Sequence, residues 1–521
     1  MAAQAPAARA TVMARARVMA LMKGLPVKPA LALAVMVLGA LGAHAAAAPL
    51  RVAVGEALPP LAPGDEIVLE AGRHTGPWRI DVPHVTLRAD ASAVLDGGGQ
   101  GSALTLAAPG VRVHGLHVVG VGPDTDLYAP DAAFRLAGCD GCVLEDVSAG
   151  EPGAGVSAAL WVEDASDVAV RGLVAYGSGA GPGVTSFHAD GLTLERLRLE
   201  GFLDGLYLER SDALRVTDAL LLGSGRYGVH LMFNRGARLE RVRASDGGVG
   251  SAIMYGRDTV LRDVAFTDHR GPMAFGLLVQ EERDARIEGA TLRGNTIGLL
   301  AVAASGLVVH GADIDANGFG ALLQRLPAAF DTADAELDTH LRIEASHFRR
   351  NAFDLALDDD RAAVRVHGNT YDRAPPLDFD GDGTLDLQHV VGTSLGALAA
   401  RLPDLSLLAF GPAMVLWEAL EARVPGARFG MLADPVPRAG PAAPSSGINP
   451  TWWLALLPLA GSAWALRPMR SIAPGAKPGA GAVPPGGSAP GARTLPPAGS
   501  APGTAPGPGA SPRGEREGGR A

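Results

Sequence analysis

The chain has 521 residues, a formal net charge of −10 and 69 glycines, and only 5% of its residues are aromatic. It is long enough for one large domain with appendages, and the abundance of glycine favours many short strands and tight turns over a helical bundle. An acidic chain without a block of basic residues argues against nucleic acid as a partner.

The first 48 residues have the pattern of an export signal. Basic residues precede an apolar run from Pro29 to Ala43, and small residues up to Ala48 offer a cleavage site. The apolar run is short for a membrane span, although a retained anchor is the alternative. Removal of residues 1–48 would take away five basic and no acidic side chains, which changes the net charge from −10 to −15.

A repeat occupies the chain from about Ser102 to Gln324. Each unit has a small residue, a short apolar strand, a polar turn and a second apolar strand. Successive units begin 23, 22, 26, 22 and 22 residues apart, at Gly205, Gly228, Gly250, Gly276, Gly298 and Gly320. Leucine-rich repeats have similar periods, but their helix and their leucine frame are missing here. The repeat predicts an all-β fold, a right-handed parallel β-helix of about 22 residues per coil over residues 49–375.

Stacked coils predict further details of this solenoid. Residues 61–72 should form a lead-in coil that caps its N-terminal end, because an open solenoid end invites edge pairing. Residues 123–130 read as an insertion. Because residues one period apart should stack about 4.8 Å apart, we expect Asn295 and Asn317 to form a side-chain ladder.

The two cysteines lie close together, as Cys139-Asp-Gly-Cys142. In an exported protein such a pair is usually a small disulfide. Free structural thiols, or a redox or copper-ligating pair, are the alternatives.

The strand after Gly228 combines an imidazole with a thioether. Alternation along the strand directs three apolar side chains inward, those of Val229, Leu231 and Phe233. His230 and Met232 then share the outer face. Met254 lies one period after Met232 and should sit beside it.

Thioether and imidazole ligands favour Cu(I) over hard cations. His230, Met232 and Met254 are therefore candidate copper ligands, and Met273 could approach them. The alternative is that the methionines are plain apolar contacts beneath a loop or a partner.

An acidic segment follows the repeat. Asp378, Asp380, Asp382 and Asp386 occupy the first, third, fifth and ninth positions of a loop with glycine at the sixth, which resembles the beginning of a Ca²⁺ loop. The twelfth position is His389 instead of glutamate, so a complete EF-hand is not expected. The alternative is a solvated acidic turn that caps the solenoid.

Acid–base catalysis has weaker candidates in His114, His117, His188 and Asp190. A β-helix lyase or epimerase acting on uronate polymers needs acidic and basic groups in one groove. No such cluster recurs with the period of the repeat. A glycan-binding surface protein is a further alternative.

The C-terminal part changes character several times. Residues 376–438 combine the acidic loop with two short amphipathic helices, expected at 395–410 and 413–423. Residues 439–447 form a linker, and 448–467 make a possible transmembrane anchor with tryptophans on one flank and basic residues on the other. Residues 468–521 are low in complexity and should be disordered.

Several motifs, taken in order, resemble the NosD family. Its His-Tyr-Met-Tyr and Ala-Leu-Met-Tyr strands look like His230-Leu-Met232-Phe233 and Ala252-Ile-Met254-Tyr255. Its Gly-Asn segment before an Asp-x-Asp-Gly-Asp-Gly loop looks like Gly368-Asn369 before Asp378–Asp386. Its ending is similar to Gly411-Pro412-Ala413 with Trp417, followed by Ala433-Asp434-Pro435.

The resemblance implies a non-enzymatic accessory factor in the periplasm, attached to the inner membrane. Such a protein would work with an ABC transporter permease and its ATPase, a copper chaperone lipoprotein and apo nitrous oxide reductase. The implied cargo is copper, held transiently as Cu(I). Residues 395–430 would be the surface that contacts the permease.

Overall fold

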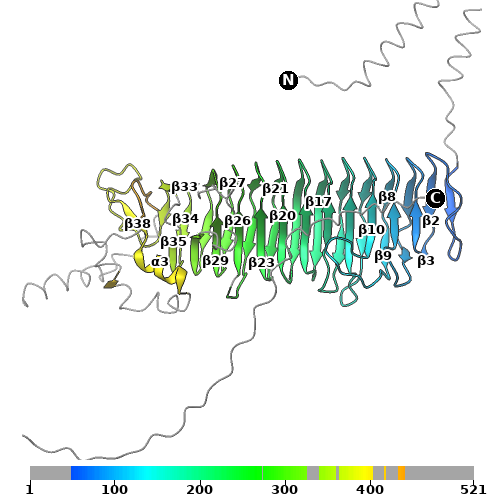
Figure 1. Cartoon of the computed structure of the whole chain (residues 1–521), viewed down its shortest axis with the longest axis horizontal. Helices are drawn as coiled ribbons and strands as arrows, with labels where there is room; N and C mark the ends of the chain where they lie inside the picture. The colour runs from blue at the N-terminus through cyan, green and yellow to red at the C-terminus, as the bar shows by residue number, and fades with distance from the viewer. Residues whose placement is uncertain are drawn as a thin grey trace, which may run out of the picture. The chain divides into compact units, whose positions relative to one another are not determined.

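The computed structural model describes residues 48–272, 274–324, 340–358, 363–402, 416–417 and 432–440. In these residues the chain is almost entirely β, and its strands stack along one axis from β2 near one end to β38 near the other (Figure 1). The predicted export signal, linker, membrane anchor and tail lie outside the described residues, apart from Ala48 and residues 439–440. No helix in the described part is long and apolar enough to cross a membrane.

One face of the solenoid is a 14-stranded sheet. Its strands are parallel in register, except that the last pair is antiparallel. In order they are β4 (Trp78–Ile80), β7 (Leu104–Leu106), β10 (Ala132–Ala137), β13 (Ala158–Glu163), β16 (Val184–Phe187), β18 (Asp204–Glu209), β20 (Tyr227–Met232), β23 (Val249–Met254), β26 (Phe275–Gln280), β29 (Ile297–Val302), β32 (Phe319–Gln324), β35 (Phe353–Asp358), β38 (His389–Gly392) and β39 (Leu432–Asp434).

The second face lies across a corner from the 14-stranded sheet. Its row comprises β1 (Leu50–Val52), β2 (Glu66–Leu69), β5 (Thr86–Ala89), β8 (Arg112–His114), β11 (Val143–Glu145), β14 (Ala169–Arg171), β17 (Thr193–Glu200), β19 (Arg215–Leu222), β21 (Arg238–Glu240), β24 (Val260–Arg262), β27 (Arg286–Glu288), β30 (Leu307–His310), β33 (His340–Glu344) and β36 (Ala363–His367).

The third face completes each coil. Its remaining strands are β3 (Gly72–Thr75), β6 (Ala93–Asp96), β9 (His117–Val119), β12 (Ser148–Ala149), β15 (Val174–Tyr176), β22 (Arg243–Ser245), β25 (Ala265–Thr267), β28 (Thr291–Arg293), β31 (Asp313–Asp315), β34 (His347–Arg349) and β37 (Thr370–Tyr371). The second and third rows count as one 25-stranded sheet because β17 and β19 continue through the corner between them. Arg196 and Asp218, at φ of 55° and 56°, make the bend inside these two strands.

The core consists of inward side chains that repeat once per coil. Leu206, Val229, Leu277 and Leu299 are fully buried and belong to one row of the 14-stranded sheet. Burial of such aliphatic side chains contributes roughly 1.5–3 kcal/mol each. The fold prediction, a parallel β-helix with one coil per repeat, is confirmed.

The asparagine ladder is also confirmed, and it extends one coil further than predicted. The backbone N–H of Asn295 donates to Oδ1 of Asn317, and that of Asn317 donates to Oδ1 of Asn351, at 3.0 Å in both cases. Each side-chain amide then donates to a carbonyl of the previous coil. The ladder satisfies polar groups that a dry corner would otherwise leave unpaired.

The lead-in coil and the insertion both have structural roles. Within residues 61–72, β2 pairs with β1 and β5 and so continues the solenoid to its N-terminal end. The insertion folds over the outside of the 14-stranded sheet. There the Leu127 carbonyl accepts a hydrogen bond from Thr185, and Tyr128 packs against Phe187 and Tyr207.

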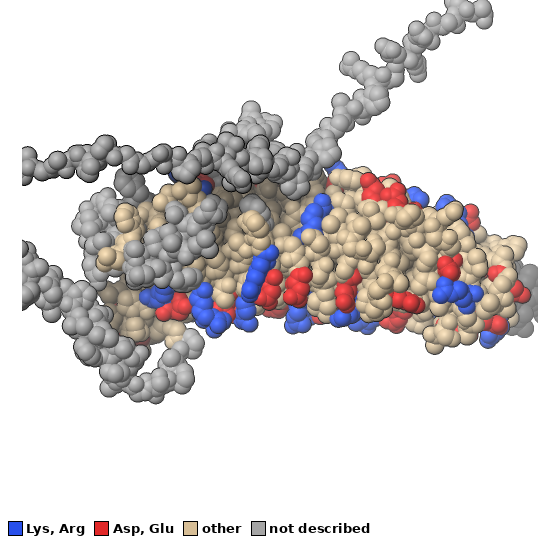
Figure 2. Space-filling view, turned by 90° about the horizontal axis from the view of Figure 1, so that it is seen from below, with Lys and Arg blue, Asp and Glu red and all other residues tan. Residues whose placement is uncertain are grey.

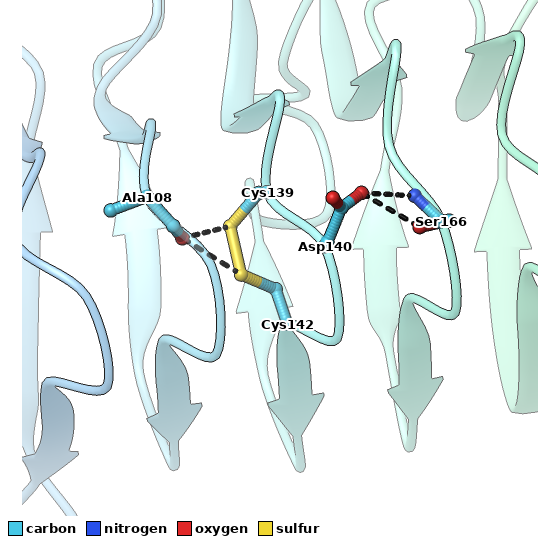
Figure 3. Close-up of a disulfide and its surroundings, with 5 residues drawn as sticks. All are labelled: Ala108, Cys139, Asp140, Cys142 and Ser166. Carbon is cyan, nitrogen blue, oxygen red and sulfur yellow. Dashed lines mark hydrogen bonds between the residues drawn. A yellow bond between two sulfur atoms is a disulfide. The ribbon is translucent and has the colours of Figure 1, made fainter.

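Cys139 and Cys142 form a disulfide at a corner between coils (Figure 3). Both residues are fully buried, and both sulfur atoms lie close to the Ala108 carbonyl oxygen of the previous coil, at 3.1 and 3.3 Å. Asp140, between them, accepts two hydrogen bonds from Ser166 of the next coil. The disulfide prediction is confirmed, and the alternatives of free thiols or a copper-ligating pair do not apply to the disulfide-bonded state.

The C-terminal end of the solenoid carries one described helix, α3 (Ser394–Arg401), capped by the side chain of Thr393. This helix begins as predicted, but its last residue is Arg401, because Leu402 already leaves helical geometry. The rest of the predicted 395–410 helix lies outside the described residues. Of the second predicted helix only Leu416 and Trp417 are described, and they are helical and exposed.

Candidate functional site

Two adjacent strands of the 14-stranded sheet, β20 and β23, carry the candidate copper ligands, and β18 lies next to β20. Met232 and Met254 pair directly in the parallel register, as the period predicts. Val229 and Leu231 belong to the core, so His230 and Met232 project from the opposite, outer face. The two thioether side chains therefore start from neighbouring positions on the outside of the solenoid.

The prediction that Phe233 points inward is wrong. Phe233 follows the end of β20 at a φ of 57°, a left-handed conformation that breaks the alternation of the strand. Its ring is 40% exposed and stacks on Tyr255 of the next coil, with ring centroids 5.1 Å apart. The ring therefore belongs to the outer surface beside the methionine pair.

His230 is held by a buried carboxylate that sequence reasoning did not find. Nδ1 of His230 lies 3.2 Å from Oδ2 of Asp204, and Asp204 is fully buried. Arg226 donates to both oxygens of the same carboxylate, at 2.8 and 2.5 Å. In the tautomer whose Nδ1 donates to Asp204, the lone pair of the imidazole is on Nε2.

Among the described residues Nε2 of His230 has no hydrogen-bond partner, although His230 is only 6% exposed. The rings of Tyr207 and Tyr227 pack against the imidazole, with centroids 4.9 and 4.5 Å away. A buried polar atom without a partner is unusual and calls for an explanation such as an absent ion. A soft cation bound at Nε2 would supply that partner.

Tyr207 links the imidazole to the methionine row. Its hydroxyl donates to Oε2 of Glu209 at 2.6 Å and lies 3.6 Å from the sulfur atom of Met232. Glu209 is also ion-paired with Arg210. The Tyr207 hydroxyl therefore lies between a carboxylate and a thioether, while its ring packs against the imidazole of His230.

Electrostatics keep Asp204 charged and Tyr207 neutral. Burial raises the pKa of Asp204, but the hydrogen bonds from Arg226 and His230 together with their charge lower it more, so its pKa lies below the ordinary value. Burial also raises the pKa of Tyr207 far above its ordinary range. A charged carboxylate hydrogen-bonded to Nδ1 of His230 increases the basicity of the other ring nitrogen, the candidate ligand atom.

The acidic loop brings three of its four predicted carboxylates together. Oxygen atoms of Asp378, Asp380 and Asp382 lie within 4.8 Å of one another. Asp386 is not part of this group, and its carboxylate accepts the backbone N–H of Phe379 at 2.5 Å. The loop is exposed and follows the last coil.

The weaker acid–base candidates do not converge. His188 contacts Asp164, at 3.2 Å, instead of Asp190, which accepts the backbone N–H of Asp212. His117 contacts Ser148, and His114 lies one strand earlier on the same sheet. Met273 lies outside the described residues. Within the described part of the chain these residues offer no common groove for proton abstraction.

Asp204 and Arg226 were missed because they occupy positions that the repeat makes inconspicuous. Asp204 precedes the small residue Gly205 that marks a new coil, and Arg226 stands at the corresponding place of the next coil, one residue earlier. The interval between them, 22 residues, equals the period and is the one signal that would have paired them.

Comparison with known proteins points to one family. Residues 164–328 match the family model described as NosD, a periplasmic copper-binding protein. A curated relative from Pseudomonas aeruginosa, named probable ABC transporter binding protein NosD, is 48% identical over 64 residues. The match covers 12% of this chain and 15% of that relative, so most of the relative's length is unmatched.

Solved structures show weaker likeness. The catalytic domain of a GH87 α-1,3-glucanase in complex with tetrasaccharides is 13% identical with a TM-score of 0.41, covering 59% of this chain and 60% of that chain. The periplasmic alginate epimerase AlgG is 12% identical with a TM-score of 0.36, covering 60% and 78%. Likeness at this level says nothing about the function of this chain.

Proposed function

We propose that this chain, a parallel β-helix protein whose residues 164–328 match the NosD family model, is a periplasmic accessory protein that holds Cu(I) on its outer face during the assembly of the copper centres of nitrous oxide reductase. The observation that carries the proposal is the buried Nε2 of His230, which has no hydrogen-bond partner in the described part of the chain and lies on the strand that ends in Met232.

The ligand set suits a transient cargo. Imidazole and thioether ligands select soft Cu(I), and Met232 and Met254 are both partly exposed. Partial exposure allows a second protein to share or take the ion. The protein would then act without catalysing a reaction of its own.

The proposed partners follow from the family and from the relative's name. They are an ABC transporter permease with its ATPase, a copper chaperone lipoprotein and apo nitrous oxide reductase, with this protein attached to the inner membrane. Co-purification with the permease and the ATPase tests the first association. A reductase that keeps its full copper content in a deletion strain would contradict the maturation role.

Replacing Met232 and Met254 together by leucine should lower Cu(I) affinity by about tenfold or more. Leucine conserves the apolar volume of methionine while removing the sulfur ligand, so the fold should persist. Cu(I) titration of the full chain against a competing chelator measures the effect. The His230→Gln variant should give a comparable loss through the imidazole.

The matched control replaces Gln280 and Val302, the next two members of the same outward row, by leucine. This control changes the same sheet face and replaces no proposed ligand, although Gln280 is the register partner of Met254. Equal Cu(I) affinity of the wild type and the double methionine variant would reject the ligand assignment while leaving the family intact.

We further propose that the acidic loop binds Ca²⁺ through Asp378, Asp380 and Asp382, with Asp386 shaping the loop instead of ligating. The Asp380→Asn variant should weaken Ca²⁺ binding by about tenfold and abolish any rise in thermal stability on adding the ion. Calorimetric Ca²⁺ titration checks this, with Asp372→Asn outside the loop as the control. Loss of binding in both variants would count against the site.

A further inference from the structure

A row of three arginines crosses three consecutive coils just beyond the strands that carry the methionine pair. Arg235, Arg257 and Arg283 are linked in sequence by parallel bridges, so they occupy equivalent places at one corner of the solenoid. All three are exposed. Because neighbouring coils lie about 4.8 Å apart, their guanidinium groups leave the surface side by side.

In the described part of the chain, ion pairs neutralise the charge of many arginines, but they do not neutralise the charge of this row. Arg171, for example, is flanked by Glu145 and Glu195 of the neighbouring coils, with N···O distances of 3.1 and 3.2 Å. Figure 2 shows the same arrangement of charges on one face, where basic and acidic side chains lie next to one another along an edge. Asp258 and Asp284 follow two of the three arginines in the chain, yet no arginine of the row makes an ion pair with any described residue.

The row lines a groove of about 400 Å³ together with the stacked rings of Phe233 and Tyr255. Contacts with neighbouring side chains hold both aromatic rings of the groove in place. Gln280 donates to the Tyr255 hydroxyl at 3.0 Å, and the guanidinium group of Arg210 lies 4.9 Å from the centre of the Phe233 ring. The carboxylate of Glu281 belongs to the same groove.

We propose that this groove docks an acidic, extended segment of a protein partner. Arginine forks bind carboxylates in a bidentate manner, and arginine beside tyrosine is the composition of binding hot spots. The carboxylate of Glu281 favours a peptide over a uniformly anionic polymer or membrane. It would repel the anionic surface, whereas it can accept a backbone N–H from a peptide. On a chain with an overall negative charge, a local positive row also orients an acidic partner.

The groove lies next to the proposed copper ligands. Arg235 and Arg257 follow Met232 and Met254 by three residues each, so a docked partner would lie beside the methionine pair. The step from docking to copper transfer rests on the proposed function. The binding of the acidic segment does not, and the two ideas can fail separately.

The test uses a fluorescent peptide of alternating glutamate and glycine and measures its anisotropy with the full chain at low and at physiological salt. Binding should weaken with salt. Replacing Arg235, Arg257 and Arg283 together by glutamine should lower affinity by about tenfold or more. The control replaces Arg215, Arg243 and Arg286, exposed arginines outside the groove, and should stay within about twofold of the wild type.

Three outcomes would overturn the proposal. They are absence of peptide binding by the wild type, equal losses in the two triple variants, which would reduce the effect to net charge, and preference for an oligouronate of equal charge, which would assign the groove to polysaccharide. The Met232→Leu plus Met254→Leu variant should bind the peptide normally even where it has lost Cu(I), which separates this inference from the copper proposal.

Discussion

Replacing Asp204 by alanine should destabilise the coils around β18 and β20 by about 3–5 kcal/mol, the usual cost of breaking a buried ion pair by removing one partner. Asp204 is fully buried and binds both Arg226 and His230. Its loss leaves Arg226 charged and only 37% exposed, and leaves Nδ1 of His230 without its acceptor. Hydrogen exchange of the amides in these strands, together with the thermal midpoint, measures the effect.

The Asp204→Ala, Arg226→Met double variant is the matched control. Removing both charges should recover part of the lost stability, since no uncompensated charge stays behind. Because the pKa of Asp204 lies below its ordinary value, the stability it provides is present at neutral pH. That contribution is lost as the pH falls below the value of an unfolded aspartate. Exchange rates in β18 and β20 that are unchanged by Asp204→Ala would contradict this account.

The sequence was sufficient to predict the solenoid, because its period is a local property that every coil repeats. A constant interval of about 22 residues fixes which residues become neighbours, and the pairing of Met232 with Met254 follows from counting alone. The same counting predicts the stack of Asn295 on Asn317. Position along the chain thus carries nearly all the information about the scaffold.

What counting could not predict is where a strand stops alternating. The prediction that Phe233 lies in the core extends the inward–outward alternation of side chains by one residue beyond the end of β20. The left-handed conformation at this corner sends the ring outward, and no simple pattern distinguishes a corner phenylalanine from a strand phenylalanine. Several other corners in the protein use the same conformation at non-glycine residues, including Tyr255 and Glu281.

The surroundings of His230 were also beyond reach of the sequence. The partner of its Nδ1 lies one coil earlier, across the strand direction, and depends on how Asp204 and Arg226 pack at a corner. Whether a histidine nitrogen is satisfied is a property of side-chain geometry. A repeat specifies rows of residues, while a site depends on which atoms in neighbouring rows meet.

Replacing Glu282 by glutamine should remove a pH dependence of stability that the wild type shows between about pH 4.5 and 7. Glu282 is 1% exposed, and burial raises its pKa to about 7 although Thr259 donates a hydrogen bond to it at 2.7 Å. The folded state thus binds this proton more tightly than the unfolded state. Stability therefore falls as pH rises through this window, by up to about 3 kcal/mol, and is level above it.

The position of Glu282 explains why glutamine should make the folded protein more stable than glutamate does at alkaline pH. It stands two coils after Asn234, whose side chain bridges Ser211 and Leu208 of the coil before. Oε2 of Glu282 accepts no hydrogen bond from any residue that the structure describes, and it lies so near Gly256 that a Cβ there would be only 2.7 Å away. A neutral amide can stay in this corner without the cost of a buried charge.

Denaturation of the wild type and of Glu282→Gln at pH 4.5 and pH 8 measures the difference. The variant should be more stable than the wild type at pH 8 and about equal to it at pH 4.5. Glu281→Gln, at the neighbouring and partly exposed position, is the control and should leave the pH dependence of the wild type in place. Since other groups also titrate in this range, the decisive quantity is the difference between variant and wild type. If the stability difference between Glu282→Gln and the wild type is the same at both pH values, Glu282 is ionised in the folded protein throughout. Contacts with the surrounding protein, and not protonation, would then compensate for its burial.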